Sequence, residues 1–299
     1  MMRGSTVVNL PEAARVNISS NVASDLLAAA ERLPRYENLE FYSSELQVRV
    51  CGAVREGCPE AFDTIISEIK KRLARPPYCA LVQGLSFDEG NKVFVAINRA
   101  FGELVARPYE KPRAQLVHYI QPSTDLPSAR GGHESERLHT DTADWDPPVE
   151  LISMVCVRED PDGGGRSRVL DVDTIRKEVN NQLGAATLNR LETEKVPWQL
   201  APYWGGGVSW RPILTSESIC WRRYTIDATG ATLSDDMLNT LRSFEELLSS
   251  TPHTLDFLMR EGELLFSHNR RTIHARTPIA NGTNSDRLMI RSWIRTNHD

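Results

Sequence analysis

Short apolar runs rich in β-branched and aromatic residues, separated by glycine-rich turns, most constrain the fold of this chain. We expect strands over residues 78–85, 115–120, 151–157, 221–226, 255–258, 263–267 and 288–294. Turns are expected over residues 162–165 and 205–207 and at Gly262. Helical patterns do not alternate regularly with these runs, which disfavours a doubly wound parallel sheet. The pattern favours an α+β protein with a double-stranded β-helix (jelly roll) core flanked by helices.

Amphipathic helices are expected in four places. Pro59 suits a first helical position, and apolar residues recur at helical spacing over residues 59–73. Asn91 is expected to cap a helix over residues 91–104. Two further helices are expected to begin after the capping residues Asp173 and Ser234.

No repeat, low-complexity segment or flexible linker divides the chain. We therefore interpret residues 1–299 as a single domain. Residues 1–75 are expected to form an N-terminal helical and strand extension. Residues 76–299 are expected to form the jelly-roll core, with an insert around residues 173–250.

Charge and cysteine usage exclude several classes of protein. The 40 acidic residues outnumber the 35 basic ones, which argues against nucleic acid as the main partner. No apolar run approaches the roughly 18–20 residues that a membrane span needs. The five cysteines form no CxxC pair and are expected to be reduced thiols in the cytoplasm. We expect a small-molecule partner, and the sequence does not indicate an oligomeric state.

The segment Arg137-Leu-His-Thr-Asp-Thr142 carries the most informative side chains. His139 and Asp141 are two residues apart, so on an extended strand they point to the same side and can reach one metal ion. His274 is the best candidate for a third ligand, and His268, at the end of an apolar run, is its competitor. Two imidazoles and one carboxylate on one face of a metal form the facial triad of non-haem Fe(II) oxygenases.

Residues 286–295 alternate with a period of two. One face is mostly aliphatic and suits packing under helices. The other face is predicted to point into the barrel; it consists of Arg287, Met289, Arg291, Trp293 and Arg295. A buried guanidinium needs a partner, and a dicarboxylate cosubstrate would supply one.

These motifs resemble an Fe(II)/2-oxoglutarate-dependent oxygenase of the taurine-dioxygenase-like superfamily, most of all its clavaminate-synthase-like branch. The resemblance rests on three segments, which are His139-Thr-Asp141, Asn269-Arg-Arg-Thr-Ile-His-Ala-Arg-Thr-Pro278 and the stretch from Asp286-Arg287 to Ile294-Arg-Thr296. That branch usually carries Glu where this chain has Asp141. Because a carboxylate is present, a halogenase is disfavoured.

The resemblance implies a role for each matching position. His139, Asp141 and His274 would bind Fe(II), and Arg287 would pair with the distal carboxylate of 2-oxoglutarate. Ser167 takes the place of a family threonine at that carboxylate, and Arg291 stands where relatives contact substrate. With O₂, such a site would hydroxylate, desaturate or cyclise a small amino-acid-derived molecule or natural-product intermediate.

Two further segments are expected near the site. Asp144 and Trp145, just past the ligand pair, are candidates to line the substrate pocket, although a plain surface turn is the alternative. The loop over residues 121–136 reads as a lid over substrate. Two other functions stay open: a zinc hydrolase that uses the same His, Asp and His ligands, and a jelly-roll binding protein without turnover.

Overall fold

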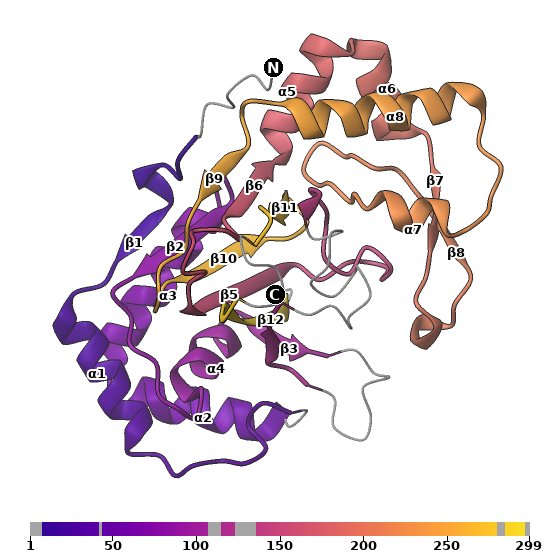
Figure 1. Cartoon of the computed structure of the whole chain (residues 1–299). Coiled ribbons are helices and arrows are strands. Elements are labelled where there is room, and N and C mark those ends of the chain that lie inside the picture. Colours follow the sequence, from indigo (N-terminus) through magenta and orange to yellow (C-terminus); the bar gives the residue numbers. More distant parts are fainter. Residues whose placement is uncertain (1–7, 42–43, 107–114, 123–135, 280–284, 297–299) are drawn as a thin grey trace.

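Two β-sheets form the centre of the protein (Figure 1). The structure is a computed structural model, and it describes residues 8–41, 44–106, 115–122, 136–279 and 285–296. The main sheet has the strand order β1 (Arg15–Asn17), β2 (Cys79–Gln83), β10 (Leu264–His268), β5 (Leu151–Arg158), β12 (Leu288–Thr296) and β3 (Gly102–Val105), with β4 (His118–Ile120) also paired to β12. The minor sheet has the order β11 (Thr272–Arg276), β6 (Ser167–Asp171) and β9 (Leu255–Phe257). A separate hairpin pairs β7 (Val196–Gln199) with β8 (Val208–Arg211).

Apolar side chains from both sheets meet in one buried cluster. Leu81 and Met289 of the main sheet pack there with Val169 and Phe257 of the minor sheet. The sheets therefore face each other across a closed core, as expected for a jelly roll. The α+β jelly-roll prediction is confirmed.

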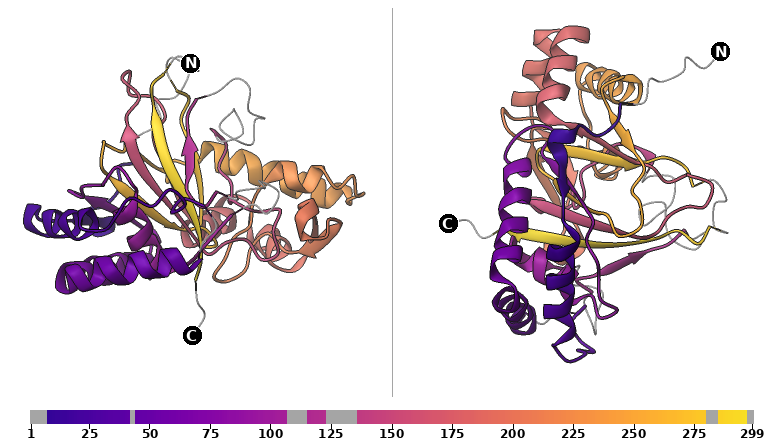
Figure 2. Two further views of the ribbon diagram at one scale, coloured as in Figure 1. Left: turned by 90° about the horizontal axis from the view of Figure 1, so that it is seen from below. Right: turned by 90° about the vertical axis from the view of Figure 1, so that its left-hand side faces the viewer.

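Helices cover the outer faces of both sheets (Figure 2). On the main sheet lie α1 (Ser20–Glu31), α2 (Ser44–Gly57), α3 (Pro59–Leu73) and α4 (Lys92–Arg99). On the minor sheet lie α5 (Val172–Gln182), α6 (Ala185–Thr193), α7 (Arg223–Asp227) and α8 (Asp235–Ser250). Two short 3-10 turns span Glu12–Ala14 and Pro202–Trp204. None of the helices in the described ranges is long and apolar enough to cross a lipid bilayer.

The strongest periodic patterns are confirmed. The predicted helix over residues 59–73 is α3, and the Ser234 hydroxyl accepts a hydrogen bond from the Met237 amide at the start of α8. On β12, Ile290 and Ile294 pack under the helices, and Met289 and Trp293 point to the opposite face. The glycine-rich turns are also confirmed, since their glycines include positive φ angles at all three places.

Three local predictions are wrong. Residues 221–226 do not form a strand, because Arg223 begins the short helix α7, where its guanidinium pairs with Asp227 at 2.8 Å. The predicted helix over residues 91–104 ends at Arg99, and its last residues belong to β3. Asp171, rather than Asp173, caps α5 by accepting from the Thr174 amide.

The cap of α4 also differs from the prediction. Asn91 has a left-handed backbone (φ 56°), and its side chain makes no capping bond. Its amide instead donates to Glu40 and to the Tyr119 hydroxyl, at 2.5 and 2.8 Å. Asp88 takes over the cap, because its carboxylate accepts from the Val93 amide at 2.9 Å.

Candidate metal centre

Backbone pairing brings the two histidines of the predicted site together. The His139 amide donates to the His274 carbonyl, and the His274 amide donates to the His139 carbonyl, each at 2.9 Å. His139 thus lies beside β11 as an extra rung of the minor sheet. The two residues are 135 positions apart in sequence, and only the fold brings them to adjacent strands.

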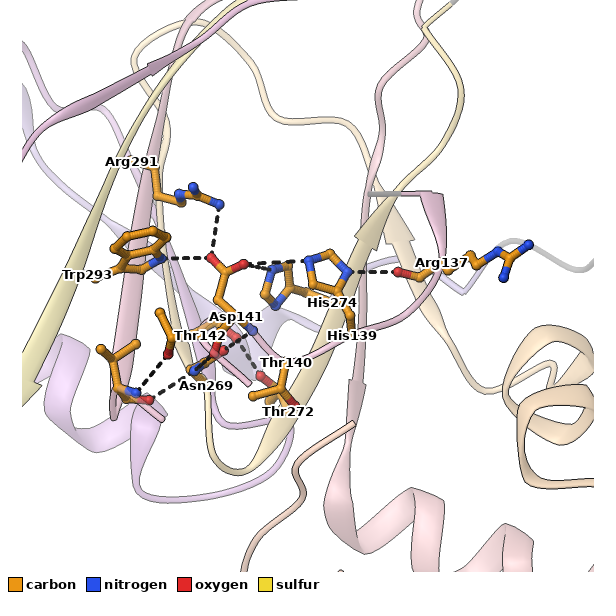
Figure 3. Close-up of polar contacts among 12 residues, drawn as sticks. Arg137, His139, Thr140, Asp141, Thr142, Asn269, Thr272, His274, Arg291 and Trp293 are labelled. Carbon is orange, nitrogen blue, oxygen red and sulfur yellow. Dashed lines mark hydrogen bonds and ion pairs between the residues drawn. The ribbon is translucent and has the colours of Figure 1, made fainter. Parts of the chain in front are cut away.

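One carboxylate oxygen faces both imidazoles (Figure 3). Oδ1 of Asp141 lies 3.5 Å from Nε2 of His139 and 3.8 Å from Nε2 of His274. The three ligand atoms lie within 4.8 Å of one another. All three side chains are largely buried, at 11%, 5% and 13% exposure in sequence order. The predicted ligand set therefore converges on one point with the donors of a facial triad.

The protonation of both histidines suits metal binding. Nδ1 of His139 lies 2.8 Å from the Arg137 carbonyl oxygen, so this nitrogen carries the proton and Nε2 keeps a lone pair for the metal. Burial, helped by the neighbouring His139 ring, lowers the pKa of His274 to about 3. His274 is thus neutral at physiological pH, which is the metal-binding form.

The second oxygen of Asp141 is fixed by the main sheet. Oδ2 accepts hydrogen bonds from Nη1 of Arg291 at 2.9 Å and from Nε1 of Trp293 at 2.8 Å (Figure 3). Burial opposes the charge of Asp141, but Arg291 and the two histidines outweigh it and hold its pKa well below the usual range. Asp141 is therefore a carboxylate with one oxygen held and the other presented to the histidines.

Asn269 holds the backbone of Asp141. Its side-chain oxygen accepts from the Asp141 amide, and its side-chain nitrogen donates to the Asp141 and Val149 carbonyls, all at 2.9–3.0 Å. The residue is fully buried. The sequence did not reveal this role, although Asn269 opens the longest of the resembling segments.

Arg287 lies in a pocket shaped by a glycine turn. Its guanidinium is buried and donates to the Gly165 carbonyl at 3.1 Å. Gly165 has φ +63°, and a Cβ there would approach Nε of Arg287 to 2.5 Å, so this close contact requires glycine. Within the described ranges no carboxylate forms an ion pair with Arg287, and burial lowers its pKa. The guanidinium thus lacks the anionic partner that buried charges usually have.

Ser167 lies on the face of β6 that points between the sheets. It is buried and stands in register with Arg276 of β11, two residues after Gly165. Arg276 in turn pairs with Glu136 at 3.3 Å. Ser167 thus follows the turn whose Gly165 carbonyl accepts from Arg287, and its role at the carboxylate of 2-oxoglutarate stays a prediction.

The other predicted site residues are placed less directly. Trp145 is 2% exposed, packs edge-on against Trp293 and donates its indole N–H to the Tyr203 hydroxyl. Trp145 therefore packs against Trp293, whose indole donates to Asp141. A contact of Trp145 with substrate stays a prediction. Asp144 is half-buried, and its carbonyl accepts from the Ala201 amide. Trp145 is buried and so does not lie on a plain surface turn, whereas Asp144 lies in the turn over residues 141–144.

The remaining candidates are resolved in part. His268, the competitor for the third ligand, does not join the metal cluster; its amide donates to the Tyr78 carbonyl. Most of the predicted lid, residues 123–135, lies outside the described residues. Arg291 pairs with Asp141, and its predicted contact with substrate stays a prediction.

Residues 79–293 match the family described as taurine catabolism dioxygenase TauD, TfdA family. The chain belongs to this family. The match spans most of the chain and includes the three metal-binding candidates together with Arg287 and Arg291. No protein of curated function matches the sequence.

Solved structures of two oxygenases share the fold of this TauD/TfdA family member. Asparagine oxygenase, in complex with Fe(II), 2S,3S-3-hydroxyasparagine and succinate, has 18% sequence identity and a TM-score of 0.75, over 95% of this chain and 94% of that one. The non-haem iron oxygenase OrfP, in complex with Fe and α-ketoglutaric acid, has 17% identity and a TM-score of 0.71 over the same shares. OrfP was also solved with Fe, succinate and (3R,4R)-dihydroxy-L-Arg, at 17% identity and a TM-score of 0.70.

Proposed function

We propose that the protein is an Fe(II)/2-oxoglutarate-dependent dioxygenase that acts on a free amino acid or an amino-acid-derived small molecule. Membership of the TauD/TfdA dioxygenase family and the buried cluster of His139, Asp141 and His274 carry this proposal. The fold relatives were solved with hydroxylated asparagine and arginine, which supports an amino-acid substrate. Hydroxylation is the expected reaction, with desaturation or ring closure as variants.

The residues present fit Fe(II). Two imidazoles and one carboxylate would hold the ion on one face and leave three positions for cosubstrate and O₂. When bound, iron would allow O₂ to oxidise 2-oxoglutarate to succinate and CO₂ and, with its remaining oxidising equivalents, to cleave a substrate C–H bond. The protein holds Oδ1 of Asp141 toward the ligand position, keeps the His274 imidazole neutral and shields the site from water.

Arg287 is the proposed partner of the distal carboxylate of 2-oxoglutarate. A bidentate guanidinium–carboxylate pair would satisfy the buried charge, and Ser167 would add a hydroxyl donor. A zinc hydrolase would leave Arg287 without this role, and an inert barrel would not need it. The dioxygenase therefore accounts for more of the buried polar groups than either alternative.

The test is a titration of metal-free protein with Fe(II) and 2-oxoglutarate under anaerobic conditions. A weak visible charge-transfer band is expected, which neither a zinc hydrolase nor an inert barrel would give. Asp141→Ala should abolish the band and the release of succinate, because it removes the anionic ligand. His268→Ala should leave both largely unchanged, and a loss there would mean that the third ligand is wrongly assigned.

Cytoplasmic location and a small-molecule partner belong to the same proposal. The five cysteines are unpaired thiols, which agrees with a reducing compartment.

A further inference from the structure

The segment that precedes α7 lies next to the metal ligands. The Thr140 amide donates to the Trp221 carbonyl at 2.7 Å, and the Trp221 amide donates to the Thr140 hydroxyl at 3.0 Å. Thr140 itself stands between His139 and Asp141. Residues 220–222 therefore run alongside the ligand pair, at the edge of the minor sheet.

Alternation along this segment places Arg222 on the metal side. The Trp221 side chain points to the outer cluster, where it packs edge-on against Phe244 with ring centroids 4.9 Å apart. Arg222 has an extended backbone, with φ −161° and ψ 98°. Successive side chains of an extended segment point to opposite faces, so Arg222 points toward the inner face, which also carries His139 and His274.

Arg222 has no protein partner in the part of the chain that the structure describes. Its half-buried guanidinium forms neither a hydrogen bond nor an ion pair there. The next residue provides a contrast, because Arg223 pairs with Asp227 at 2.8 Å and with Glu245 at 3.6 Å. A partly desolvated cation at the edge of a metal site is a recognition element for an anion.

The charges around the site, with metal and 2-oxoglutarate bound, also favour an anionic partner for Arg222. Arg291 offsets Asp141, and Arg276 offsets Glu136. Arg287 is the proposed partner of the distal carboxylate of 2-oxoglutarate, which leaves Arg222, among the guanidinium groups named here, without an anion. A zwitterionic amino acid with a neutral side chain would bring no net charge to this site, whereas an acidic side chain would bring one negative charge.

We propose that Arg222 binds a side-chain carboxylate of the primary substrate, so that the substrate is an acidic amino acid or a close derivative of one. This inference rests on the proposed function and narrows its substrate class. Arg222 is then a specificity-determining residue that the family motifs do not include.

The test compares amino acids of similar shape and different charge. Protein loaded with Fe(II) and 2-oxoglutarate receives L-aspartate or L-asparagine, L-glutamate or L-glutamine, and L-lysine or L-arginine. Affinity is measured by anaerobic calorimetry, and succinate release and product mass are measured after O₂ is added. Aspartate and glutamate should each bind at least about tenfold more tightly than the corresponding amide, and more tightly than L-lysine or L-arginine.

Substitutions of Arg222 then test the assignment. Arg222→Gln should abolish the preference for acids. Arg222→Lys should retain part of the preference, because lysine keeps the positive charge but lacks the paired N–H donors of a guanidinium. Arg222→Glu should shift the preference to L-lysine and L-arginine. Arg223→Gln is the matched control and should leave the preference unchanged, since its partners lie on α7 and α8.

The outcomes separate this inference from the proposed function. Slow succinate release without any amino acid, together with no stimulation by the acids, overturns the inference and leaves the dioxygenase in place. A preference of the native protein for amides or cations overturns it as well, as does a folded Arg222→Gln variant that still prefers acids. Absence of succinate under all conditions overturns the proposed function, and the inference with it.

Discussion

At the scale of single residues, the two oxygens of Asp141 have separate tasks. Oδ1 faces the histidines, and Oδ2 is held by two donors from β12. Aspartate is one methylene shorter than the glutamate usual in the clavaminate-synthase-like branch. Its orientation therefore depends on donors that reach it from the neighbouring sheet.

Trp293→Phe should weaken metal binding by about tenfold, because partners of ligating carboxylates typically contribute 10–100-fold to affinity. The substitution keeps an aromatic ring and removes only the indole N–H that bonds Asp141. Anaerobic titration with Fe(II) or Co(II) measures the effect. Trp198→Phe is the control, since Trp198 is also buried but donates to the Arg211 carbonyl. Equal affinities for both variants would contradict this role of Trp293.

His268 should make stability depend on pH. Burial, together with the nearby Arg271, lowers its pKa from 6.5 to about 4, so the unfolded chain binds a proton more readily than the folded one between these values. The contribution is complete above pH 6.5 and is lost as pH falls toward 4, with a loss on the order of 2 kcal/mol at pH 5.

Urea unfolding of metal-free protein at pH 7 and pH 5 measures this loss. His268→Gln should lose less stability between the two pH values than the native protein does. An identical loss in both would mean that His268 does not carry this proton.

At the scale of elements, the turn before β6 and Arg287, the residue before β12, are in contact and together form the proposed anion site. Arg287→Ala should raise the KM for 2-oxoglutarate more than tenfold, since loss of a buried charge-assisted pair typically costs about 2–5 kcal/mol. Arg287→Lys should recover only part of the affinity for 2-oxoglutarate, because lysine keeps the positive charge but lacks the paired N–H donors of a guanidinium. Steady-state kinetics with each substrate varied in turn would decide. A larger effect of Arg291→Ala on 2-oxoglutarate would reverse the two assignments.

Gly165→Ala provides a second variant of the same site. This variant keeps Arg287 but should also raise the KM for 2-oxoglutarate, because the added Cβ would collide with the Arg287 side chain and displace it. Gly163→Ala is its control, since a Cβ there meets nothing within 4 Å and the backbone strain is of the same kind (φ +74°).

At the scale of the whole molecule, the N-terminal extension is built into the barrel. Phe62 and Ile65 of α3 share one buried cluster with Val82, Val155 and Ile294 of the main sheet. We therefore expect one cooperative unfolding transition in calorimetry, as predicted for a single domain. Deletion of residues 1–75 should yield insoluble protein, because it exposes an apolar sheet face. A soluble, folded fragment would show that the extension is a separate domain.

Strong local signals determined much of this protein from sequence alone. Residues 59–73 and 235–250 carry helical periodicity with good first positions, and β12 carries a clear two-residue alternation. The spacing of His139 and Asp141 placed two ligands on one side of a strand. These features depend on backbone geometry within a few residues, which is why they could be predicted.

The tertiary structure decided which distant side chains meet. Whether residues 221–226 form a strand or a turn and a short helix depended on pairing with Thr140, about 80 positions away. In the same way, contact between the sheets pairs Arg291 with Asp141, and hydrogen bonds between Thr140 and Trp221 place the segment that carries Arg222 beside the metal ligands. No periodicity encodes such contacts, because hydrogen bonds and ion pairs depend on distance in space, and closure of the two sheets sets that distance.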